Sequence, residues 1–237
     1  MKRACKRSMP QTMNRMDKHD RLQFITVEGG EGAGKSTLID QLARILHQQG
    51  FEVLKTREPG GTAFGEQIRK WLLSHHGEIK IGARAELLLF LAARAQHIEE
   101  VIIPSINAGK VVLCDRFNDS TIAYQGAARS LGISWVSSLC DKVCGSVKPD
   151  LTFYLDVDPK IGLKRTKKAT KENAARGDFD RIEAEQLEFH QKVREAFLTF
   201  AKEEPERFHS IDAHLPKEAV LKQALHILSP YLQQSGI

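Results

Sequence analysis

A glycine-rich segment that contains one lysine and one serine carries the strongest chemical signal in the sequence. It reads Gly29-Gly30-Glu31-Gly32-Ala33-Gly34-Lys35-Ser36 and fits the pattern G-x-x-x-x-G-K-[ST]. Glycines let the backbone curl so that successive N–H groups point at phosphate oxygens. In such a loop the lysine reaches the β- and γ-phosphates, and the serine hydroxyl is a ligand of Mg²⁺. The segment therefore predicts a binding site for a nucleoside triphosphate.

Two arginines stand where a second phosphate group could be held. Arg57 follows the apolar run 51–56, and Arg116 follows the run 110–115. An enzyme that phosphorylates a small acceptor needs arginines that neutralise the acceptor's phosphate and hold it in line with the γ-phosphate of the donor. The two positions therefore favour a kinase that acts on small phosphorylated molecules.

Other classes of nucleotide-binding protein fit the sequence less well. Regulatory GTPases read their base with N-K-x-D, and this tetrapeptide does not occur. The net charge of +5 lies entirely in residues 1–21, which hold seven basic and two acidic residues, so the rest of the chain is formally neutral. A nucleic-acid-binding ATPase that grips phosphates with this basic arm remains an alternative. It predicts DNA-stimulated ATP turnover that is lost when residues 1–15 are removed.

Short strands that alternate with helices are expected to position these groups. Hydrophobic patterning predicts strands over 24–28, 51–56, 110–115 and 151–156, and helices over 38–46, 67–73, 83–107 and 182–200. The polar stretch 162–181 interrupts the alternation. Such an order is typical of the α/β class, with a parallel sheet covered by helices on both faces. Its sites lie beyond the carboxyl ends of the strands, directly after the predicted strands.

Composition indicates a globular protein with a basic N-terminal extension. Hydrophobic residues make up 41% and charged residues 27% of the chain, and no apolar run approaches the roughly 18 residues that a membrane span requires. We expect residues 1–21 to be a disordered extension and 22–237 to form a single domain. Four methionines lie in the extension, so Met13 and Met16 are alternative translation starts. A transit peptide remains an alternative, whereas the apolar segment of a secretory signal is missing. The cysteines lack metal or disulfide spacing, which favours a reducing, cytoplasmic setting.

Several motifs together resemble the bacterial thymidylate kinases. They are Glu28 to Thr37, Thr56-Arg57-Glu58-Pro59-Gly60-Gly61-Thr62, Phe90-Leu91-Ala92-Ala93-Arg94, Asp115-Arg116-Phe117, Tyr124-Gln125-Gly126 and Pro149 to Asp156. The resemblance extends from Leu22 to the C-terminal region. It implies a three-layer P-loop NTPase fold with a five-stranded parallel sheet and a mobile lid. It also implies transfer of the ATP γ-phosphate to dTMP, a requirement for Mg²⁺, and a homodimer. A related kinase with another acceptor, such as dUMP or dCMP, remains an alternative.

The resemblance assigns residues to each part of this reaction. The residues assigned to ATP binding are Gly29, Gly30, Glu31, Gly32, Ala33, Gly34, Lys35, Ser36, Thr37 and Arg165. Those assigned to Mg²⁺ are Ser36 and, through water, Asp115. The residues assigned to dTMP binding are Glu31, Arg57, Phe90, Arg94, Arg116, Ser120, Thr121, Tyr124 and Gln125. In this assignment Arg57 holds the acceptor phosphate, Phe90 stacks on thymine, and Arg94 reaches a carbonyl of the base. The catalytic set is Lys35, Asp115, Arg116 and Arg176.

The lid is the segment where the sequence departs from the family pattern. Gly32 stands where one branch of the family carries an arginine, and in the bacterial branch a lid arginine replaces that cation. The lid is expected at about 162–181, with Arg176 as the first choice and Arg165 as the second. The part from Lys167 to Ala175 is longer than in a typical bacterial lid. A charged run that is only solvated surface remains the alternative.

Overall fold

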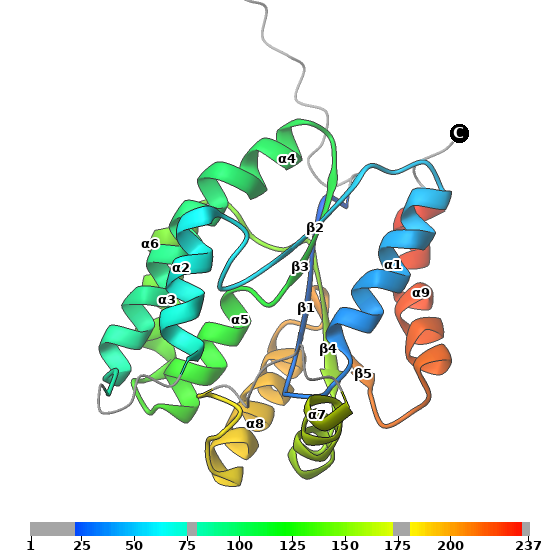
Figure 1. Cartoon of the computed structure of the whole chain (residues 1–237). Coiled ribbons are helices and arrows are strands. Elements are labelled where there is room, and N and C mark those ends of the chain that lie inside the picture. Colours follow the sequence, from blue (N-terminus) through cyan, green and yellow to red (C-terminus); the bar gives the residue numbers. More distant parts are fainter. Residues whose placement is uncertain (1–21, 75–79, 173–180, 234–237) are drawn as a thin grey trace, which may run out of the picture.

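A parallel sheet forms the centre of the protein (Figure 1). The computed structural model describes residues 22–74, 80–172 and 181–233. Within these ranges the strands are β1 (Phe24–Gly29), β2 (Val53–Arg57), β3 (Val111–Asp115), β4 (Leu151–Asp156) and β5 (Phe208–Asp212). Their order across the sheet is β2-β3-β1-β4-β5, and every neighbouring pair is parallel. The expected α/β class and five-stranded parallel sheet are confirmed.

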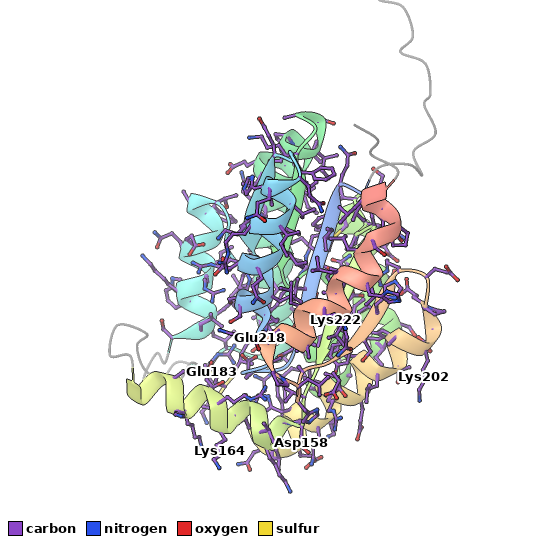
Figure 2. All side chains as sticks on the ribbon, turned by 90° about the vertical axis from the view of Figure 1, so that its right-hand side faces the viewer. Asp158, Lys164, Glu183, Lys202, Glu218 and Lys222 are labelled. Atoms are coloured by element: carbon purple, nitrogen blue, oxygen red, sulfur yellow. The ribbon has the colours of Figure 1, made fainter. Side chains whose placement is uncertain are left out.

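Helices cover both faces of this sheet. They are α1 (Lys35–Gln48), α2 (Ala63–Leu73), α3 (Ala83–His97), α4 (Ile103–Asn107), α5 (Asn118–Thr121), α6 (Ile133–Cys144), α7 (Pro159–Glu172), α8 (Leu187–Glu203) and α9 (Lys217–Gln233), with π-helical segments η1 (Ile98–Ile102) and η2 (Ile122–Ala128). Figure 1 shows α1 and α9 on one side of the sheet and α2 to α6 on the other. In Figure 2, which looks onto the side of α1 and α9, α7 runs along one end of the molecule and Lys164 lies on its outer side.

Alternation along the strands explains the two layers of the core. Ile25 and Val27 of β1 are buried against residues of α1 and α9. Phe24, one position earlier, points to the opposite face and packs in a cluster with Ile98 and Ile102 of η1. Successive side chains of a strand point to opposite faces. The strands therefore bury apolar side chains on both faces, as parallel sheets do.

The carboxyl ends of three strands meet at one edge of the sheet. Arg57 at the end of β2 is in register with Asp115 at the end of β3, and Asp115 is in register with Val27 of β1. Backbone hydrogen bonds continue past the strands, because Arg116 N–H donates to the carbonyl of Val27 across 3.1 Å. This edge brings the P-loop and both predicted phosphate-binding arginines together.

Some elements differ from the sequence-based expectation. Strand β5 was not located from the sequence. The stretch expected to interrupt the alternation from 162 is helical as part of α7, and the helix expected from 182 begins at Leu187. The long helix expected over 83–107 is present, but its middle turn is the π-helical segment η1. Among the described residues, the model contains no helix long and apolar enough to cross a membrane.

Candidate active site

A cavity of about 580 Å³ opens at the carboxyl edge of the sheet. Its walls come from segments far apart in the sequence: Glu31 to Thr37, Arg57 to Pro59, Arg69, Leu73, Phe90, Arg94, Asp115 to Phe117, Ser120, Thr121, Tyr124, Gln125, Arg165, Thr166, Ala169, Ile182 and Glu183. All the predicted site residues within the described ranges line this cavity except Gly29 and Gly30. Those two glycines form the base of the P-loop. Arg176, the predicted lid arginine, lies outside the described residues.

The P-loop has the geometry that an anion site requires. Gly34 has a φ of 95°, which glycine adopts without a steric penalty, and α1 begins directly after it. The N-terminal end of α1 therefore faces the cavity with unpaired N–H groups and a partial positive charge. The ammonium group of Lys35 donates to the carbonyl oxygens of Gly29 and Gly30, at 3.2 and 2.9 Å. Lys35 thus bends back over the loop at the edge of the cavity.

The P-loop packs tightly against the first turn of α7. Gly32 has a φ of 65°, and a Cβ atom there would come within 2.1 Å of the carbonyl oxygen of Gly162. A Cβ atom on Gly162 would in turn come within 2.2 Å of the carbonyl oxygen of Glu31. Neither position leaves room for a side chain. The structure therefore gives a steric reason why this chain carries glycine where one branch of the family carries arginine.

Two oxygen donors at the mouth of the P-loop could hold a divalent cation. The hydroxyl of Ser36 donates to Oδ2 of Asp115 across 3.2 Å. Ser36 is exposed and Asp115 is half-buried, so both groups face the cavity. The described residues contain no group of three or more His, Cys, Asp or Glu side chains that could enclose a metal. A hard cation that keeps several waters and binds mainly to substrate phosphates, such as Mg²⁺, fits this sparse pair of oxygens.

Arg116 occupies the centre of the cavity wall in a network of hydrogen bonds. Its Nη2 donates to Glu31 across 2.7 Å, its Nη1 donates to Ser120 across 3.1 Å, and its guanidinium lies 4.9 Å from the ring centre of Tyr124. The hydroxyl of Tyr124 also donates to Glu31, at 2.9 Å. Arg116 has a φ of 69°, an unusual backbone conformation for a residue with a side chain. Strain of this kind is common at functional sites, where surrounding contacts maintain it.

The charges of this network stay fixed near neutral pH. Burial would raise the pKa of Glu31, but the positive charges of Arg116 and Lys35 outweigh burial and lower it to about 2. Burial alone would lower the pKa of Arg116, but nearby Tyr124 and the carboxylates of Glu31 and Asp115 raise it above its ordinary value. The cavity therefore presents an ionised carboxylate and a permanent cation side by side.

Arg57 also lines the cavity, and its guanidinium group is paired with the carboxylate of Glu66. Its Nη2 donates to Oε2 of Glu66 on α2 across 3.0 Å, and its side chain is half exposed. Glu66 Oε1 also accepts from the N–H of Gly61 across 3.2 Å. The guanidinium keeps other N–H groups free to bind an anion, since an arginine carries five donors.

Part of the cavity wall, called the base recess below, is formed by an aromatic ring and by polar side chains that can form hydrogen bonds. It belongs to the same cavity as the predicted phosphate-binding arginines. Phe90 is half-buried in its wall, and Arg94, one helical turn later on α3, is buried. Arg94 Nη2 donates to the hydroxyl of Thr121 across 2.8 Å. The amide of Gln125 donates to the buried Glu86 across 2.8 Å, which fixes its orientation. A flat ring against Phe90 would meet these polar groups at its edge.

Sequence reasoning missed two buried acids beside the predicted residues. Glu28 accepts from the N–H of Phe117 across 2.7 Å and from Ser120, and Glu58 accepts from Arg94 across 2.7 Å. Burial raises the pKa of Glu28 to about 8, an effect that neighbouring Asp119 increases. Glu28 ends the predicted strand 24–28, and Glu58 lies two residues after the predicted strand 51–56. These positions were the available signal. Arg69, which also lines the cavity, gave no such signal because it lies within helix α2.

Arg165 lies at the far side of the cavity on α7. Its Nη1 donates to the carbonyl of Ala213, after β5, across 2.9 Å. The contact joins α7 to the carboxyl edge of β5. Arg165 thus lines the same cavity as the other residues predicted to contact ATP.

Comparisons with known proteins show the family to which the chain belongs. The family model described as Thymidylate kinase matches residues 27–224. A thymidylate kinase from Protochlamydia amoebophila is 58% identical over 214 residues, which are 90% of this chain and 95% of that protein. Another from Chlamydia trachomatis serovar D is 49% identical over 204 residues, 85% of this chain and 96% of that protein.

A solved structure shares both fold and sequence with the chain. The crystal structure of thymidylate kinase from Ehrlichia chaffeensis superposes with a TM-score of 0.68 at 34% identity, over 87% of this chain and 98% of that chain. Since the family model spans most of the sequence and the relatives match along nearly their whole length, the chain belongs to the thymidylate kinase family.

Proposed function

We propose that this protein transfers the γ-phosphate of ATP to dTMP and releases dTDP and ADP. One observation carries the proposal: a single cavity unites the P-loop with two further arginines, Arg57 and Arg116, and with the recess at Phe90 and Arg94. The P-loop accounts for the donor. The two arginines account for a phosphorylated acceptor, and the recess accounts for its base.

The donor binds along the P-loop and the N-terminal end of α1. Backbone N–H groups and Lys35 bind the β- and γ-phosphates, and Arg165 lies toward the nucleoside end. Ser36 and Asp115 would hold Mg²⁺, the latter through water, and the cation supplies neutralisation of charge on the phosphates. Electrostatic stabilisation of this kind supplies much of the catalysis in phosphoryl transfer.

The acceptor binds with its base in the recess and its phosphate between the arginines. Thymine stacks on Phe90, and Arg94, Ser120, Thr121 and Gln125 contact the polar edge of the base. Arg57 binds the acceptor phosphate through a planar pair of N–H donors. Glu31 accepts from the 3′-hydroxyl of the sugar, and the ring of Tyr124 beside it leaves little room for a 2′-hydroxyl.

The transfer itself needs alignment more than covalent chemistry. An oxygen of the dTMP phosphate forms a bond to the γ-phosphorus, and the bond between that phosphorus and the β–γ bridging oxygen breaks, which leaves ADP. Arg116 and Lys35 neutralise charge on the transferring group while it is between the two nucleotides. Arg176, outside the described residues, is proposed to add a further cation from the lid.

A coupled assay of ADP release across several monophosphates tests the proposal. dTMP should be the best acceptor by kcat/KM when it is compared with dUMP, dCMP and dGMP at saturating ATP. A higher kcat/KM for another monophosphate would replace thymidylate with that acceptor. Added duplex DNA should leave ATP turnover unchanged; stimulation that disappears on removal of residues 1–15 would favour the nucleic-acid-binding alternative.

A homodimer is part of the proposal, and exposed apolar side chains support it. Phe64 and Trp71 on α2, Leu88 on α3 and Trp135 on α6 are 47 to 60% exposed, on helices that lie together on one side of the sheet (Figure 1). Large apolar side chains that are exposed on neighbouring helices are candidates for an interface. Light scattering after size exclusion should give a dimer for the wild type and a monomer for Trp71→Arg/Trp135→Arg. Leu215→Arg, an exposed leucine before α9, is the control that should remain dimeric.

The cysteines support a reducing compartment, and we propose the cytoplasm. Cys114, Cys140 and Cys144, the cysteines in the described ranges, are buried free thiols. Burial raises the pKa of Cys144 to about 11. Buried, protonated thiols of this kind are inert and pack as small apolar side chains.

A further inference from the structure

A chain of buried hydrogen bonds holds the side chain of Arg94 from behind. Arg94 Nε donates to Oε2 of Glu58 across 2.7 Å, and Oε1 of Glu58 lies 2.9 Å from Nδ1 of His97. His97 Nε2 lies 2.6 Å from the hydroxyl oxygen of Thr56 on β2. The side chains of Arg94, Glu58 and His97 are at most 4% exposed. The chain thus runs from the sheet through α3 to the wall of the cavity.

Donors and acceptors in this chain can be assigned from its chemistry. The carboxylate of Glu58 only accepts hydrogen bonds, so Nδ1 of His97 carries a proton and donates to it. In the neutral ring Nε2 then accepts from the hydroxyl of Thr56. Turning the ring would break both bonds. A Cβ atom built on Gly61 would lie 2.5 Å from the ring, so the backbone of Gly61 packs closely against this edge of His97 and leaves no room for a side chain between them.

The remaining sides of the Arg94 guanidinium are also fixed. Its Nη2 donates to Thr121 across 2.8 Å, its Nη1 lies 3.7 Å from the sulfur of Cys140, and the ring of Phe117 lies 5.1 Å from its central carbon. Burial alone would lower the pKa of Arg94, but the charge of Glu58 raises it above its ordinary value. The group that faces the recess is therefore a permanent, immobile set of N–H donors.

A fixed set of donors discriminates between acceptor bases. Arginine has no hydrogen-bond acceptor, so it pairs with a ring carbonyl and leaves a ring amino group unpaired. A buried site built for one hydrogen-bonding partner rejects the analogue that lacks it strongly, because the polar groups are then unsatisfied. The discrimination depends on the guanidinium staying in place, since a mobile arginine could turn away from the amino group.

We infer that Glu58 and His97 are positioning residues that set base specificity by fixing the orientation of Arg94. Neither of these two side chains is assigned a contact with the acceptor. They act through Arg94, and the inference rests on the proposed function because Arg94 reads the base in it. Without them the cavity keeps its phosphate-binding groups and loses the rigid edge that favours a pyrimidine with a carbonyl group at C4 over cytosine, which carries an amino group there.

The variant Glu58→Gln tests this role because it keeps the size of the side chain and removes the charge that holds Arg94. We expect the KM for dTMP to rise about 10-fold and kcat to change less than about threefold, since the phosphates are still aligned. The ratio of kcat/KM for dTMP to that for dCMP should fall at least about fivefold. The KM for ATP should stay constant. A folded Glu58→Gln enzyme with an unchanged ratio overturns the inference.

A pair of variants at His97 covers the case in which Glu58→Gln fails to fold. His97→Asn keeps an amide donor near the position of Nδ1, whereas His97→Leu removes it. The ratio of kcat/KM for dTMP to that for dCMP should stay within about twofold of wild type in His97→Asn and fall about fivefold in His97→Leu. Equal ratios in both variants overturn the inference, whatever their melting temperatures.

A control separates base specificity from a general loss of stability. Arg207 pairs with the buried Asp119 across 2.8 Å and lies away from the base recess, so Arg207→Lys should lower the melting temperature without changing the ratio. A ratio that falls equally in this control attributes the effect to instability and overturns the inference. If the wild type does not phosphorylate dTMP, the proposed function fails. If it does, but the ratio of kcat/KM for dTMP to that for dCMP is unchanged by the substitutions of Glu58 and His97, only this inference fails.

Discussion

Arg116 and Glu31 form an ion pair of 2.7 Å that joins the segment after β3 to the P-loop. Both residues line the cavity, Arg116 on the side proposed for the acceptor and Glu31 in the loop proposed for the donor. The pair therefore connects the two proposed substrate sites. Both side chains are less than a fifth exposed, so solvent screens their attraction only partly.

The variant Glu31→Gln should lower turnover more than it weakens ATP binding. Without the negative partner, the guanidinium of Arg116 loses its fixed direction toward the transferring group. Loss of one charge-assisted contact in a preorganised site costs on the order of 10- to 100-fold in kcat. Steady-state kinetics with both substrates varied measures this. Arg116→Lys keeps the positive charge but loses the planar set of N–H donors, so it should be at least as slow as Glu31→Gln. An unchanged kcat in both variants would remove the pair from the mechanism.

The same pair predicts how stability depends on pH. The pKa of Glu31 is lowered from 4.5 to about 2 in the folded protein, because Arg116 and Lys35 outweigh the effect of burial. A carboxyl group whose folded pKa is depressed adds stability above its unfolded pKa and loses it as pH falls toward the folded value. The contribution is therefore complete above about pH 5 and is lost between pH 4.5 and 2. It amounts to about 3 kcal/mol at most.

Urea unfolding of wild type and Glu31→Gln at several pH values measures this contribution. The glutamine does not titrate, so the difference in the free energy of unfolding should shrink by about half or more between pH 6 and pH 3. A difference that stays constant over this range would contradict the lowered pKa of Glu31. Glu206→Gln, the same change at an exposed surface carboxylate, serves as the control for general acid effects.

Local patterns in the sequence predicted the elements whose own residues form a motif or a hydrophobic pattern. The P-loop was located by its motif. Strands β1 to β4 were located because they are short, mainly apolar segments followed by turn or charged residues. Strand β5 was missed because its two apolar residues, Phe208 and Ile211, are separated by two polar residues and lie beside a charged stretch, and α7 because charge was weighed above helical spacing. The contacts of Glu28 and Glu58 depend on partners 89 and 36 residues away, and such pairings arise only when folding brings these segments together.

The contact between Gly32 and Gly162 predicts sensitivity to a single methyl group. Gly162→Ala places a Cβ atom 2.2 Å from the carbonyl oxygen of Glu31, so α7 must move away from the P-loop. We expect a loss of about 1 to 3 kcal/mol in unfolding free energy, as for other overpacked sites, and an increase in the KM for ATP. Urea unfolding and ATP titration of the kinetics measure both. Gly82→Ala is the control for the loss of a glycine alone, since Gly82 has a φ of −70° and a Cβ atom there meets nothing within 4 Å.

The ion pair between Arg57 and Glu66 predicts a substitution that improves acceptor binding. Arg57 donates to Glu66 across 3.0 Å, so a phosphate that binds Arg57 competes with this carboxylate for the guanidinium. The hydrogen bonds from Arg57 and Gly61 lower the pKa of Glu66, which keeps it charged at neutral pH. Glu66→Gln keeps a hydrogen-bond acceptor for Gly61 but removes the charge. The KM for dTMP should therefore fall about two- to fivefold at low ionic strength.

Salt dependence and a second variant decide whether the gain comes from this charge. The advantage of Glu66→Gln should diminish at about 0.5 M KCl, because salt screens the attraction by which the half-exposed Glu66 holds Arg57 in the wild type. Arg57→Ala should instead raise the KM for dTMP about 10-fold or more and leave the KM for ATP near its wild-type value, since it removes the bidentate donor for the acceptor phosphate alone. In the double variant the benefit of Glu66→Gln should vanish, because its only route to the acceptor is Arg57. A benefit that persists without Arg57 would mean that Glu66 repels the phosphate directly and that the ion pair does not restrain the arginine.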